Sequence, residues 1–560
     1  MGSSVNISNS IFQNNFLSNT SLIAIGNDDV TTETLVTIWN NVLFLSNTQI
    51  LQMALGLNIV GQNIKFLMQD NVTFENNYAQ NSLVYVSNTL NVADITDIYL
   101  TNNFGFEMIT LQLITNVTIT QMECLSNNDL SYQYYLIDEI PDTPGNCLSV
   151  IDYANFQSID CVFSYNFAIS TLTGVLLEHT SDVTLLGITA DQALAYFDNF
   201  QCIGNIANAT LDNLINDGNC INLDNSGLIT MTNNQIVNNV VNVDLEAEYS
   251  GNPCLISTSN DNSLTIIDSV FIGNMAYSEC SCLNFFGTYF ILNNVSFIEN
   301  RSIKLQIGTD APTFYVDNEG GCMNLGPAFI IMQNVMIFNS SAMKGAGIFF
   351  HNKDSKNTQT LDAYNVSMIQ NEGIQTSGIE FDASLIVGEY HFTSCMINYN
   401  KVEFYGVIST FYYTAFNIYF YDCDINYNWG ISAGAAFSYY HFGGNFYINN
   451  SRMNGNVLNE TVFVGGAALF LYGTTYYTII YVNNCTFINN TSTLKGGAIQ
   501  TMYGQVIAED SLFIDNTAIY GGAVSVAIYC PGSFQNIVVR NSYPVSQGGA
   551  FHFSEQSQVE

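Results

Sequence analysis

The chain has 560 residues, of which 48% are hydrophobic and only 10% are charged. Its 47 acidic residues outnumber its 10 basic ones and give a formal net charge of −37. A field of this sign repels nucleic-acid phosphates and anionic lipid headgroups, so we expect neither nucleic-acid binding nor membrane association. Divalent cations such as Ca2+ are the counterions that such a chain would attract.

One short pattern recurs along almost the whole chain: an apolar residue, two residues of any type, and Asn. Its eighteen copies are spaced 25 to 39 residues apart, with a mean period of about 31 residues. A period in this range is typical of a solenoid, in which each repeat packs on its neighbours. The copies begin, in chain order, at Phe12, Phe44, Phe74, Leu100, Leu125, Phe163, Cys202, Ile236, Phe271, Phe297, Met336, Met368, Ile397, Ile425, Met453, Phe487, Phe513 and Val538.

A position that was not used to find the pattern repeats with it. In fourteen of the eighteen copies, Asn or Asp stands three residues before the apolar residue, although these two types make up only about 18% of the chain. Asn and Asp tolerate left-handed backbone and bond their own main chain. We therefore predict a short strand between two corners, with the asparagines of successive coils stacked in amide ladders. The fourteen residues are Asn9, Asn41, Asn71, Asp97, Asp160, Asn199, Asn233, Asp268, Asn294, Asn365, Asp422, Asn450, Asn484 and Asp510.

A second motif, Gly-Gly-Ala followed by an apolar residue, comes after the first in the later repeats. It occupies residues 496–499, 521–524 and 548–551, with looser copies at 345–348, 434–437 and 465–468. Earlier copies, at 145–148, 218–221 and 320–323, carry Cys in the Ala position. Gly permits a bend, and a small residue after it allows the next coil to pack closely.

Together the two motifs resemble the repeat of chlamydial polymorphic outer-membrane proteins and of ciliate and other protist surface proteins. The resemblance is clearest from residue 336 to 551, for example in Phe487-Ile488-Asn489-Asn490 and Gly496-Gly497-Ala498-Ile499. It implies a right-handed parallel β-helix of the pectin-lyase-like class. We thus predict an all-β solenoid of about 18 coils, from about Val5 to Phe553. Residues 1–560 would form one elongated domain, as a segment of a longer chain or as a stacking subunit.

The pectin-lyase-like class includes lyases and hydrolases that act on acidic polysaccharides. Its lyases use Arg or Lys as base, but the three arginines here, Arg301, Arg452 and Arg540, flank or lie within the repeat motif, as surface residues would. The Gly-His-Gly and Arg-x-Lys motifs of its hydrolases do not occur in the sequence. The negative charge also disfavours an anionic polymer. We therefore predict no enzyme, with a polysaccharide lyase or hydrolase as the less favoured alternative.

The thirteen cysteines follow the repeat and so behave mainly as small buried residues. Because stacked coils lie about 4.8 Å apart, bridges between neighbouring coils are feasible. Cys220, Cys254, Cys282 and Cys322 share the Ala position and should form one column. If oxidised, the expected pairs are Cys220 with Cys254, Cys282 with Cys322, and Cys395 with Cys423.

Three further kinds of site are visible. Asp244, Glu246 and Glu248 alternate and would project from one face of a strand, as a metal site or, more simply, as a solvated acidic stripe. Aromatic residues crowd the segment 404–481, where outward rings could stack on sugars, contact a neighbouring subunit, or pack under loops. The apolar segment 462–482 reads as two strands and not as a membrane span. Fourteen N-glycosylation sequons occur, with candidates at Asn71, Asn116, Asn208, Asn294, Asn365, Asn459 and Asn484.

These observations favour an extracellular or cell-surface structural glycoprotein that associates with itself end to end. A surface adhesin that binds carbohydrate or other surface proteins is the alternative. Terminal coils of a solenoid expose unpaired backbone and apolar residues unless they are capped. We expect the junctions between subunits, or with more of the same chain, to lie near residues 9–16 and 534–553. No cofactor is expected other than Ca2+, at the acidic residues named above.

Overall fold

The protein is described here by a computed structural model, in which all the regular elements of the described residues are β-strands. No α-helix occurs in that part of the chain. The described residues are 3–18, 20–27, 33–49, 55–61, 63–79, 82–87, 92–105, 107–127, 147–168, 174–179, 192–209, 220–224, 227–243, 256–259, 263–276, 281–303, 321–326, 329–351, 359–382, 387–410, 415–459, 465–473, 478–527, 531–554 and 558–559.

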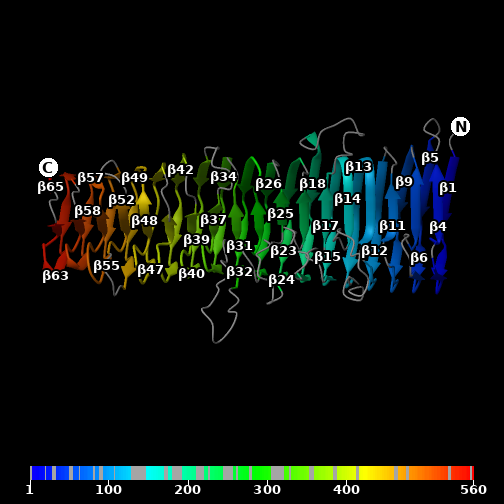
Figure 1. The fold of residues 1–560 in the computed structure, drawn as a ribbon, viewed down its shortest axis with the longest axis horizontal. Coiled ribbons are helices and arrows are strands. Elements are labelled where there is room, and N and C mark those ends of the chain that lie inside the picture. Colours follow the sequence, from blue (N-terminus) through cyan, green and yellow to red (C-terminus); the bar gives the residue numbers. More distant parts are fainter. Residues whose placement is uncertain are drawn as a thin grey trace. The chain divides into compact units, whose positions relative to one another are not determined.

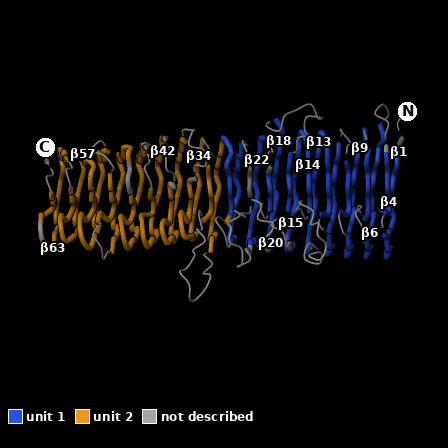
Figure 2. The backbone as a smooth tube through the Cα atoms, viewed as in Figure 1, with its two compact units in different colours: residues 1–278, 282–288 blue, residues 279–281, 289–560 orange. Residues whose placement is uncertain are grey.

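The chain divides into two compact units, which Figure 2 colours separately. Unit 1 comprises Met1–Ser278 and Cys282–Thr288, and unit 2 comprises Glu279–Ser281 and Tyr289–Glu560. Within each unit, successive coils lie side by side and pair through parallel strands (Figure 1). Each unit is therefore a parallel β-helix, which confirms the predicted all-β fold class. That both units belong to one domain stays a prediction.

Each coil of unit 1 contains up to four short strands, and each strand pairs with its counterpart in the neighbouring coil. The first strands are β1 (Ser3–Ser8), β5 (Thr34–Trp39), β9 (Ile64–Gln69), β18 (Leu194–Asp198), β22 (Leu228–Thr232) and β26 (Ser263–Ile267). The second are β2 (Ile11–Gln13), β6 (Val42–Leu45), β10 (Val72–Glu75), β15 (Val162–Ser164), β19 (Gln201–Ile203), β23 (Gln235–Val237) and β27 (Val270–Ile272). The third are β3 (Phe16–Leu17), β7 (Thr48–Gln49), β16 (Phe167–Ala168), β20 (Ile206–Ala209), β24 (Val240–Val243) and β28 (Met275–Ala276). The fourth are β4 (Ile23–Asn27), β8 (Leu57–Gly61), β11 (Ser82–Ser87), β17 (Val175–Glu178), β21 (Ile221–Asp224), β25 (Ile256–Ser259) and β29 (Leu283–Phe285). Three longer strands, β12 (Val92–Thr101), β13 (Glu107–Leu125) and β14 (Leu148–Ile159), run through two or three of these positions.

Unit 2 repeats the same four positions. Its first strands are β30 (Tyr289–Asn293), β34 (Phe329–Gln333), β38 (Gln359–Tyr364), β42 (Val387–Thr393), β46 (Ala415–Tyr421), β49 (Phe446–Asn449), β53 (Ile479–Asn483), β57 (Gln505–Glu509), β61 (Pro531–Gln535) and β65 (Gln558–Val559). The second are β31 (Ser296–Ile298), β35 (Met336–Phe338), β39 (Ser367–Ile369), β43 (Met396–Asn398), β50 (Arg452–Asn454), β54 (Thr486–Ile488), β58 (Leu512–Ile514) and β62 (Val538–Arg540). The third are β32 (Arg301–Ser302), β36 (Ser341–Ala342), β40 (Glu372–Gly373), β44 (Lys401–Val402), β47 (Trp429–Gly430), β51 (Val457–Leu458), β55 (Thr491–Ser492), β59 (Thr517–Tyr520) and β63 (Tyr543–Gln547). The fourth are β33 (Met323–Leu325), β37 (Ile348–His351), β41 (Ile379–Asp382), β45 (Ile408–Thr410), β48 (Phe437–Phe442), β52 (Leu469–Gly473), β56 (Ile499–Met502), β60 (Val524–Ala527) and β64 (Phe551–Ser554).

The corner between the first and second strands has the backbone that the sequence predicts. All fourteen Asn and Asp residues that stand three before the motif residue have a positive φ, between 47° and 64°. Short polar side chains are the non-glycine residues that best tolerate this left-handed conformation. The position two after the motif residue is a second left-handed corner, as at Asn14, Asn76 and Asn489. These two corners bound the second strand and limit it to three or four residues in most coils.

The motif residues lie inside each unit and stack from coil to coil. Phe12 pairs with Phe44, and Phe44 pairs with Phe74, with ring centroids 4.9 and 4.5 Å apart. In unit 2, Phe487 and Phe513 stack in the same way at 4.8 Å. Such parallel contacts bury both ring faces and remove apolar surface from water at every coil.

Three motif assignments are wrong by one residue. The inward residues of those coils are Cys124, Ile337 and Val539, and the predicted ones, Leu125, Met336 and Val538, are their neighbours in sequence. In two of these coils a serine, Ser340 or Ser542, stands where the other coils have asparagine. The corner residue just before each serine, Asn339 or Asn541, was therefore mistaken for the asparagine that ends the motif. Leu125 was misassigned because two asparagines follow each other at positions 127 and 128.

The glycine motif forms the bend before the fourth strand. Gly496 and Gly521 have φ values of 57° and 61°, and a Cβ on either would lie within 2.3 Å of a main-chain oxygen. The following Ala498 and Ala523 are fully buried, and they precede the paired residues Ile499 and Val524. The positions of Ala498 and Ala523 therefore require a small residue, because the backbones of neighbouring coils lie in close contact there.

The long apolar segment 462–482 contributes the strands β52 and β53. Across the described residues, the structure contains no helix with the length and apolarity needed to span a membrane.

Candidate functional site

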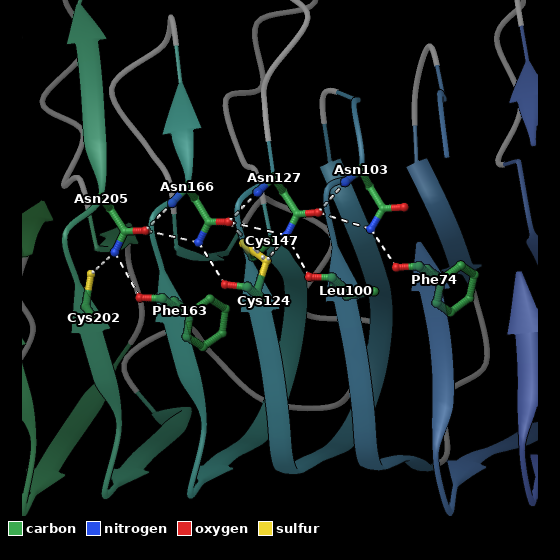
Figure 3. Close-up of a disulfide and its surroundings, with 10 residues drawn as sticks. All are labelled: Phe74, Leu100, Asn103, Cys124, Asn127, Cys147, Phe163, Asn166, Cys202 and Asn205. Carbon is green, nitrogen blue, oxygen red and sulfur yellow. Dashed lines mark hydrogen bonds between the residues drawn. A yellow bond between two sulfur atoms is a disulfide. The ribbon is translucent and has the colours of Figure 1, made fainter. Parts of the chain in front are cut away.

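The asparagine that ends the motif is buried and bonds to both neighbouring coils. Asn47 Oδ1 accepts hydrogen bonds from the main-chain N and from Nδ2 of Asn15, at 3.0 and 2.8 Å. Asn47 Nδ2 donates to the Phe12 carbonyl at 2.9 Å and to Asn77 Oδ1 at 3.0 Å. One amide therefore satisfies a main-chain N and a main-chain carbonyl of the preceding coil and bonds to the amide of the following coil. Figure 3 shows the same arrangement for Asn103, Asn127, Asn166 and Asn205 further along unit 1.

This buried ladder runs through most of the described coils in each unit. Buried amides must be hydrogen-bonded to be stable, and here each one is bonded to the next. In unit 1 the ladder consists of Asn15, Asn47, Asn77, Asn103, Asn127, Asn166, Asn205, Asn239 and Asn274. In unit 2 it consists of Asn371, Asn400, Asn428, Asn456, Asn490 and Asn516, preceded by Ser340.

Two disulfides join the second strand of a coil to the turn before its fourth strand. They are Cys124–Cys147 and Cys202–Cys220, with Cα atoms 6.3 and 6.1 Å apart. The ladder amide of the same coil donates to the bridge, because Asn127 Nδ2 lies 3.2 Å from Cys124 Sγ (Figure 3). The cysteines thus replace the inward motif residue and the small turn residue together.

The predicted pairing of cysteines is wrong where the structure describes it. Cys220 is bonded to Cys202 and therefore not to Cys254, which itself lies outside the described residues. Sequence reasoning considered only stacked positions on neighbouring coils, whereas the bridge forms across the interior of a single coil. The predicted column is confirmed for Cys220 and Cys282. Cys220 directly precedes Ile221 and Cys282 directly precedes Leu283, and these two residues pair with Ile256 from its two sides, so the cysteines occupy the same position of the repeat.

The other two predicted bridges are also not formed. Cys322, Cys395 and Cys423 are buried thiols. Cys395 and Cys423 do lie on neighbouring coils, and the main-chain N of Cys395 is 3.4 Å from Cys423 Sγ. Each thiol, however, is turned towards main-chain carbonyls, with Cys423 Sγ 3.2 Å from the Tyr421 oxygen. The two thiols contact each other, but no disulfide joins them.

Six of the seven candidate sequons lie on the outer surface. Asn71, Asn116, Asn294, Asn365, Asn459 and Asn484 are all exposed, and the side chain of Asn208 lies outside the description. The corner sequons form exposed ladders of their own: Asn71 Nδ2 donates to Asn41 at 2.7 Å, and Asn484 Nδ2 donates to Asn450 at 2.8 Å. Asn459 is an exposed sequon without such a ladder bond among the described residues, as expected for a position off the corners.

The predicted acidic site, Asp244, Glu246 and Glu248, lies outside the described residues. Within those residues, no three His, Cys, Asp or Glu side chains gather closely enough to hold a metal ion. The three arginines are exposed, as their positions in the repeat indicated. Arg452 forms a two-pronged ion pair with Asp424 on the neighbouring coil, at 2.5 and 2.6 Å.

An outward row of aromatic side chains crosses four first strands of unit 2. His391, Tyr419, Tyr447 and Tyr481 are in register, with successive ring centroids 4.5, 4.7 and 4.8 Å apart. Their planes are within 6° of parallel. Burial among these rings, together with the nearby Glu389 carboxylate, raises the pKa of Tyr419 above its usual value.

This stacking decides what the row can bind. A sugar ring packs against the open face of an aromatic ring, but here the faces of Tyr419 and Tyr447 are covered by their neighbours in the row. Only ring edges and hydroxyl groups reach solvent between the ends of the row. The geometry favours a stabilising contact between coils, a role that was not among the three interpretations drawn from the sequence.

The first coil of unit 1 and the last coil of unit 2 differ from the coils inside each unit. Ile7 and Phe12 are half-buried, whereas their partners one coil further on, Ile38 and Phe44, are at most 1% exposed. Among the described strands, β1, β2, β3 and β4 each pair on one edge only. In the last coil, β62, β63 and β64 likewise pair on one edge, and Val539 is half-buried.

Sequence reasoning missed the buried carboxyl groups of the described residues, which are those of Glu107, Asp152 and Glu380. Glu107 is 6% exposed at the start of β13, where Thr110 donates a hydrogen bond to it and Ser149 donates another at 3.0 Å. Ser82 bonds to Thr110 at 2.8 Å. Burial raises the pKa of Glu107 from 4.5 to about 7. The repeat motifs gave no signal for it, because Glu107 occupies no conserved position of the pattern within this chain.

No family model matches the chain, and no curated protein matches its sequence.

Proposed function

We propose that this chain is an extracellular structural glycoprotein that forms a filament or a cell-surface scaffold by end-to-end stacking of β-helical coils. The observation that carries the proposal is the state of the two outer coils. Each presents strand edges that pair on one side only, together with half-buried members of the inward column. Open edges of this kind readily pair with another chain.

A second copy of the same chain is the partner that these edges fit. Every coil uses the same parallel pairing. The open edge of β62 therefore presents hydrogen-bond donors and acceptors at the spacing that the open edge of β2 needs in a partner strand. The inward column would continue from Val539 to Phe12. Contact between two different ends is heterologous and produces a filament when it does not close into a ring.

The extracellular location is proposed on two grounds. The disulfides Cys124–Cys147 and Cys202–Cys220 require an oxidising compartment to form and persist. The exposed sequons at Asn116 and Asn459 would be accessible to N-glycosylation in such a compartment. Glycans would add polar surface to a chain that has few charged residues.

We propose a non-catalytic role because the three arginines, all within the described residues, do not form a site. Arg301 and Arg540 are exposed, and Arg452 is neutralised by Asp424. A polysaccharide lyase or hydrolase of this fold class would need a basic or acidic group directed into a substrate groove. The proposed relationship to pectin-lyase-like surface proteins of chlamydiae and protists, which rests on the repeat motif, is compatible with a structural role.

A surface adhesin is the second candidate, and an apolar patch favours it. Tyr289, Phe329 and Ile331 on β30 and β34 are 50%, 44% and 46% exposed, and the rings of Tyr289 and Phe329 stack at 5.1 Å. Exposed apolar groups gathered on one face often mark a protein contact. Carbohydrate binding is less favoured, since the tyrosine row offers covered ring faces.

The proposal is tested by placing a charge in the open inward column. Ile7→Lys leaves its ammonium partly in water in the free chain but buries it between two stacked copies, where an unpaired charge is strongly unfavourable. We expect the wild-type protein to sediment as polymers in analytical ultracentrifugation and the variant to sediment as a single chain.

Asn6→Lys is the matched control. Asn6 lies on the same strand, β1, but it is exposed on the outer face, so the added charge is the same and the stacking surface is unchanged. Polymers should persist in this variant, and circular dichroism should show unchanged β-structure in both. A wild-type protein that remains a single chain at all concentrations, or equal disruption by both substitutions, contradicts end-to-end stacking.

A further inference from the structure

Two exposed tyrosines occupy the same corner on neighbouring coils of unit 2. Tyr399 and Tyr427 each stand two residues after the motif residue and have left-handed backbone, with φ values of 59° and 57°. Their rings stack with centroids 5.0 Å apart and planes 12° from parallel. They are 56% and 53% exposed, so this is a solvent-accessible tyrosine pair.

The backbone holds the two rings in place. The main-chain N of Tyr399 donates to the Asn426 carbonyl at 3.1 Å, and the N of Tyr427 donates to the Asn454 carbonyl at 2.8 Å. On the next coil the corner residue is Gly455, and a Cβ there would lie 2.5 Å from the ring of Tyr427. Glycine therefore lets that ring lie flat, with Tyr399 on its other face. The ring edges and hydroxyl groups are left to solvent.

From this geometry we infer that Tyr399 and Tyr427 form a site of oxidative cross-linking, at which a haem peroxidase using hydrogen peroxide joins the two rings as dityrosine. Each phenol loses one electron and one proton and becomes a phenoxyl radical. A Cε carbon of one ring, which is ortho to the oxygen and carries a hydrogen, bonds to the equivalent carbon of the other ring. The hydrogens on those two carbons move to the oxygens and restore both phenols. Hydrogen peroxide accepts the two electrons and two protons and becomes two molecules of water.

Proximity is what distinguishes this pair. Coupling needs two radicals in contact, and these two rings already lie against each other with their centroids 5.0 Å apart. Tyr364 is similarly exposed, at 51%, but makes no ring contact with another residue in the described part of the chain. It should therefore be oxidised without finding a partner.

The outward tyrosine row is a weaker candidate for the same chemistry. Tyr419 and Tyr447 also stack, at 4.7 Å, but both are only half-exposed. Burial raises the pKa of each above its usual value, so loss of the phenolic proton is less favourable there. The greater exposure of Tyr399 and Tyr427 therefore directs the oxidant to them.

The consequence would be a covalent brace between two successive coils. A cross-link of this kind stabilises mainly by restricting the unfolded chain, as a disulfide does. The inference concerns single chains and does not depend on end-to-end stacking, so either proposal can fail while the other stands.

The test is to treat the purified protein with a haem peroxidase and hydrogen peroxide, digest it with trypsin, and sequence the products by mass spectrometry. Cleavage after Lys401 separates Tyr399 from Tyr427, so a cross-link appears as two joined peptides that are two hydrogen atoms lighter than their sum. Tyr399→Phe and Tyr427→Phe keep the ring stack but remove the reacting phenol. We expect loss of the joined peptide in both variants and its retention in the control Tyr364→Phe.

Three outcomes would overturn the inference. One is a joined peptide whose fragments place the bond on Tyr419 or Tyr447. Another is a product found only between chains, as a covalent dimer on a denaturing gel. The third is no product from the folded protein under conditions in which free tyrosine is coupled. Unchanged circular dichroism of the phenylalanine variants ensures that a loss of product reflects the missing phenol and not a loss of fold.

Discussion

At the scale of single residues, asparagine has two separate roles in each coil. At the corners it supplies left-handed backbone, as Asn41 and Asn71 do, and its side chain remains on the surface. At the end of the motif its side chain is buried and bonds to the coils on both sides, as that of Asn166 does with the Cys124 carbonyl and with Asn205 Oδ1. The sequence predicted the corners and the ladders, because both depend on local backbone preference and on the repeat itself.

Asn166→Ala tests the buried ladder. The substitution removes the acceptor for the main-chain N of Asn127 and the donor to the Cys124 carbonyl, and leaves both groups buried. Each unsatisfied buried group costs about 1–3 kcal/mol, so we expect the free energy of unfolding to fall by about 2–4 kcal/mol. Urea denaturation followed by circular dichroism measures it.

The matched control is Asn116→Ala, which removes an exposed hydrogen bond with Asn155. Water replaces that bond, so the change should stay below about 1 kcal/mol. Equal effects of the two substitutions would contradict the assignment of stability to the buried ladder.

Glu107 gives unit 1 a defined pH dependence. Its pKa is raised from 4.5 to about 7, so the folded state binds the proton more tightly than the unfolded state does. Stability from this group is fully present below pH 4.5 and is lost as the pH rises towards and through 7. At about 1.36 kcal/mol for each pKa unit, the loss is about 3 kcal/mol.

We expect Glu107→Gln to remove this loss, since the amide is uncharged; its oxygen can accept from one of the hydroxyl groups of Thr110 and Ser149, and its NH2 group can donate to the other. The free energy of unfolding measured between pH 4 and pH 8 should decline in the wild-type protein and be flatter in the variant. Identical slopes would show that Glu107 is not buried as a neutral acid. Composition could not reveal this group, because an isolated Glu in a sequence is usually a surface residue.

At the scale of strands and turns, the sequence predicted which residues bend the chain but not always which residue points inward. The inward residue was misassigned where Ser340 and Ser542 take the place of the ladder asparagine. Their hydroxyl groups donate to carbonyls of their own coil, those of Phe338 and Arg540. The disulfides were misassigned for a different reason. Cys202 and Cys220 meet across the interior of one coil, and that contact depends on how the coil closes.

The tyrosine row illustrates a third limit. His391, Tyr419, Tyr447 and Tyr481 come into register only because loops of different lengths separate their strands. Alternation along each strand could predict that the rings point outward. It could not predict that they cover each other's faces, since that depends on the lateral register of four coils.

Gly496→Ala tests the role of the glycine bend. Gly496 has a φ of 57°, and a Cβ would lie 2.1 Å from the Ile499 oxygen, so the turn must distort. We expect a loss of at least about 1 kcal/mol in the free energy of unfolding, because alanine is disfavoured at positive φ in addition to the clash.

Gly26→Ala is the control for this prediction. A Cβ on Gly26 would meet its nearest atom, the Val60 oxygen, at 3.7 Å, which is an ordinary contact. Thermal unfolding of the two variants should show a clear decrease in Tm for Gly496→Ala and little change for Gly26→Ala. Similar decreases for both would mean that the bend does not require glycine.

At the scale of the whole molecule, the account depends on continuity from one coil to the next. Within each unit, inward columns, strand edges and ladder amides are all satisfied by the neighbouring coil. The outer coils, with half-buried Phe12 and Val539, lack this cover in the described residues. The net charge of −37 on every copy opposes association, and added salt screens that repulsion. We therefore expect assembly to increase with ionic strength, which light scattering would record.

Electron cryomicroscopy of the purified wild-type protein at moderate salt tests the central claim most directly. The account predicts filaments in which the last coil of one copy pairs with the first coil of the next, so that the inward column continues from Val539 to Phe12. Single particles with both outer coils open to solvent, or copies joined only along their sides, would contradict it.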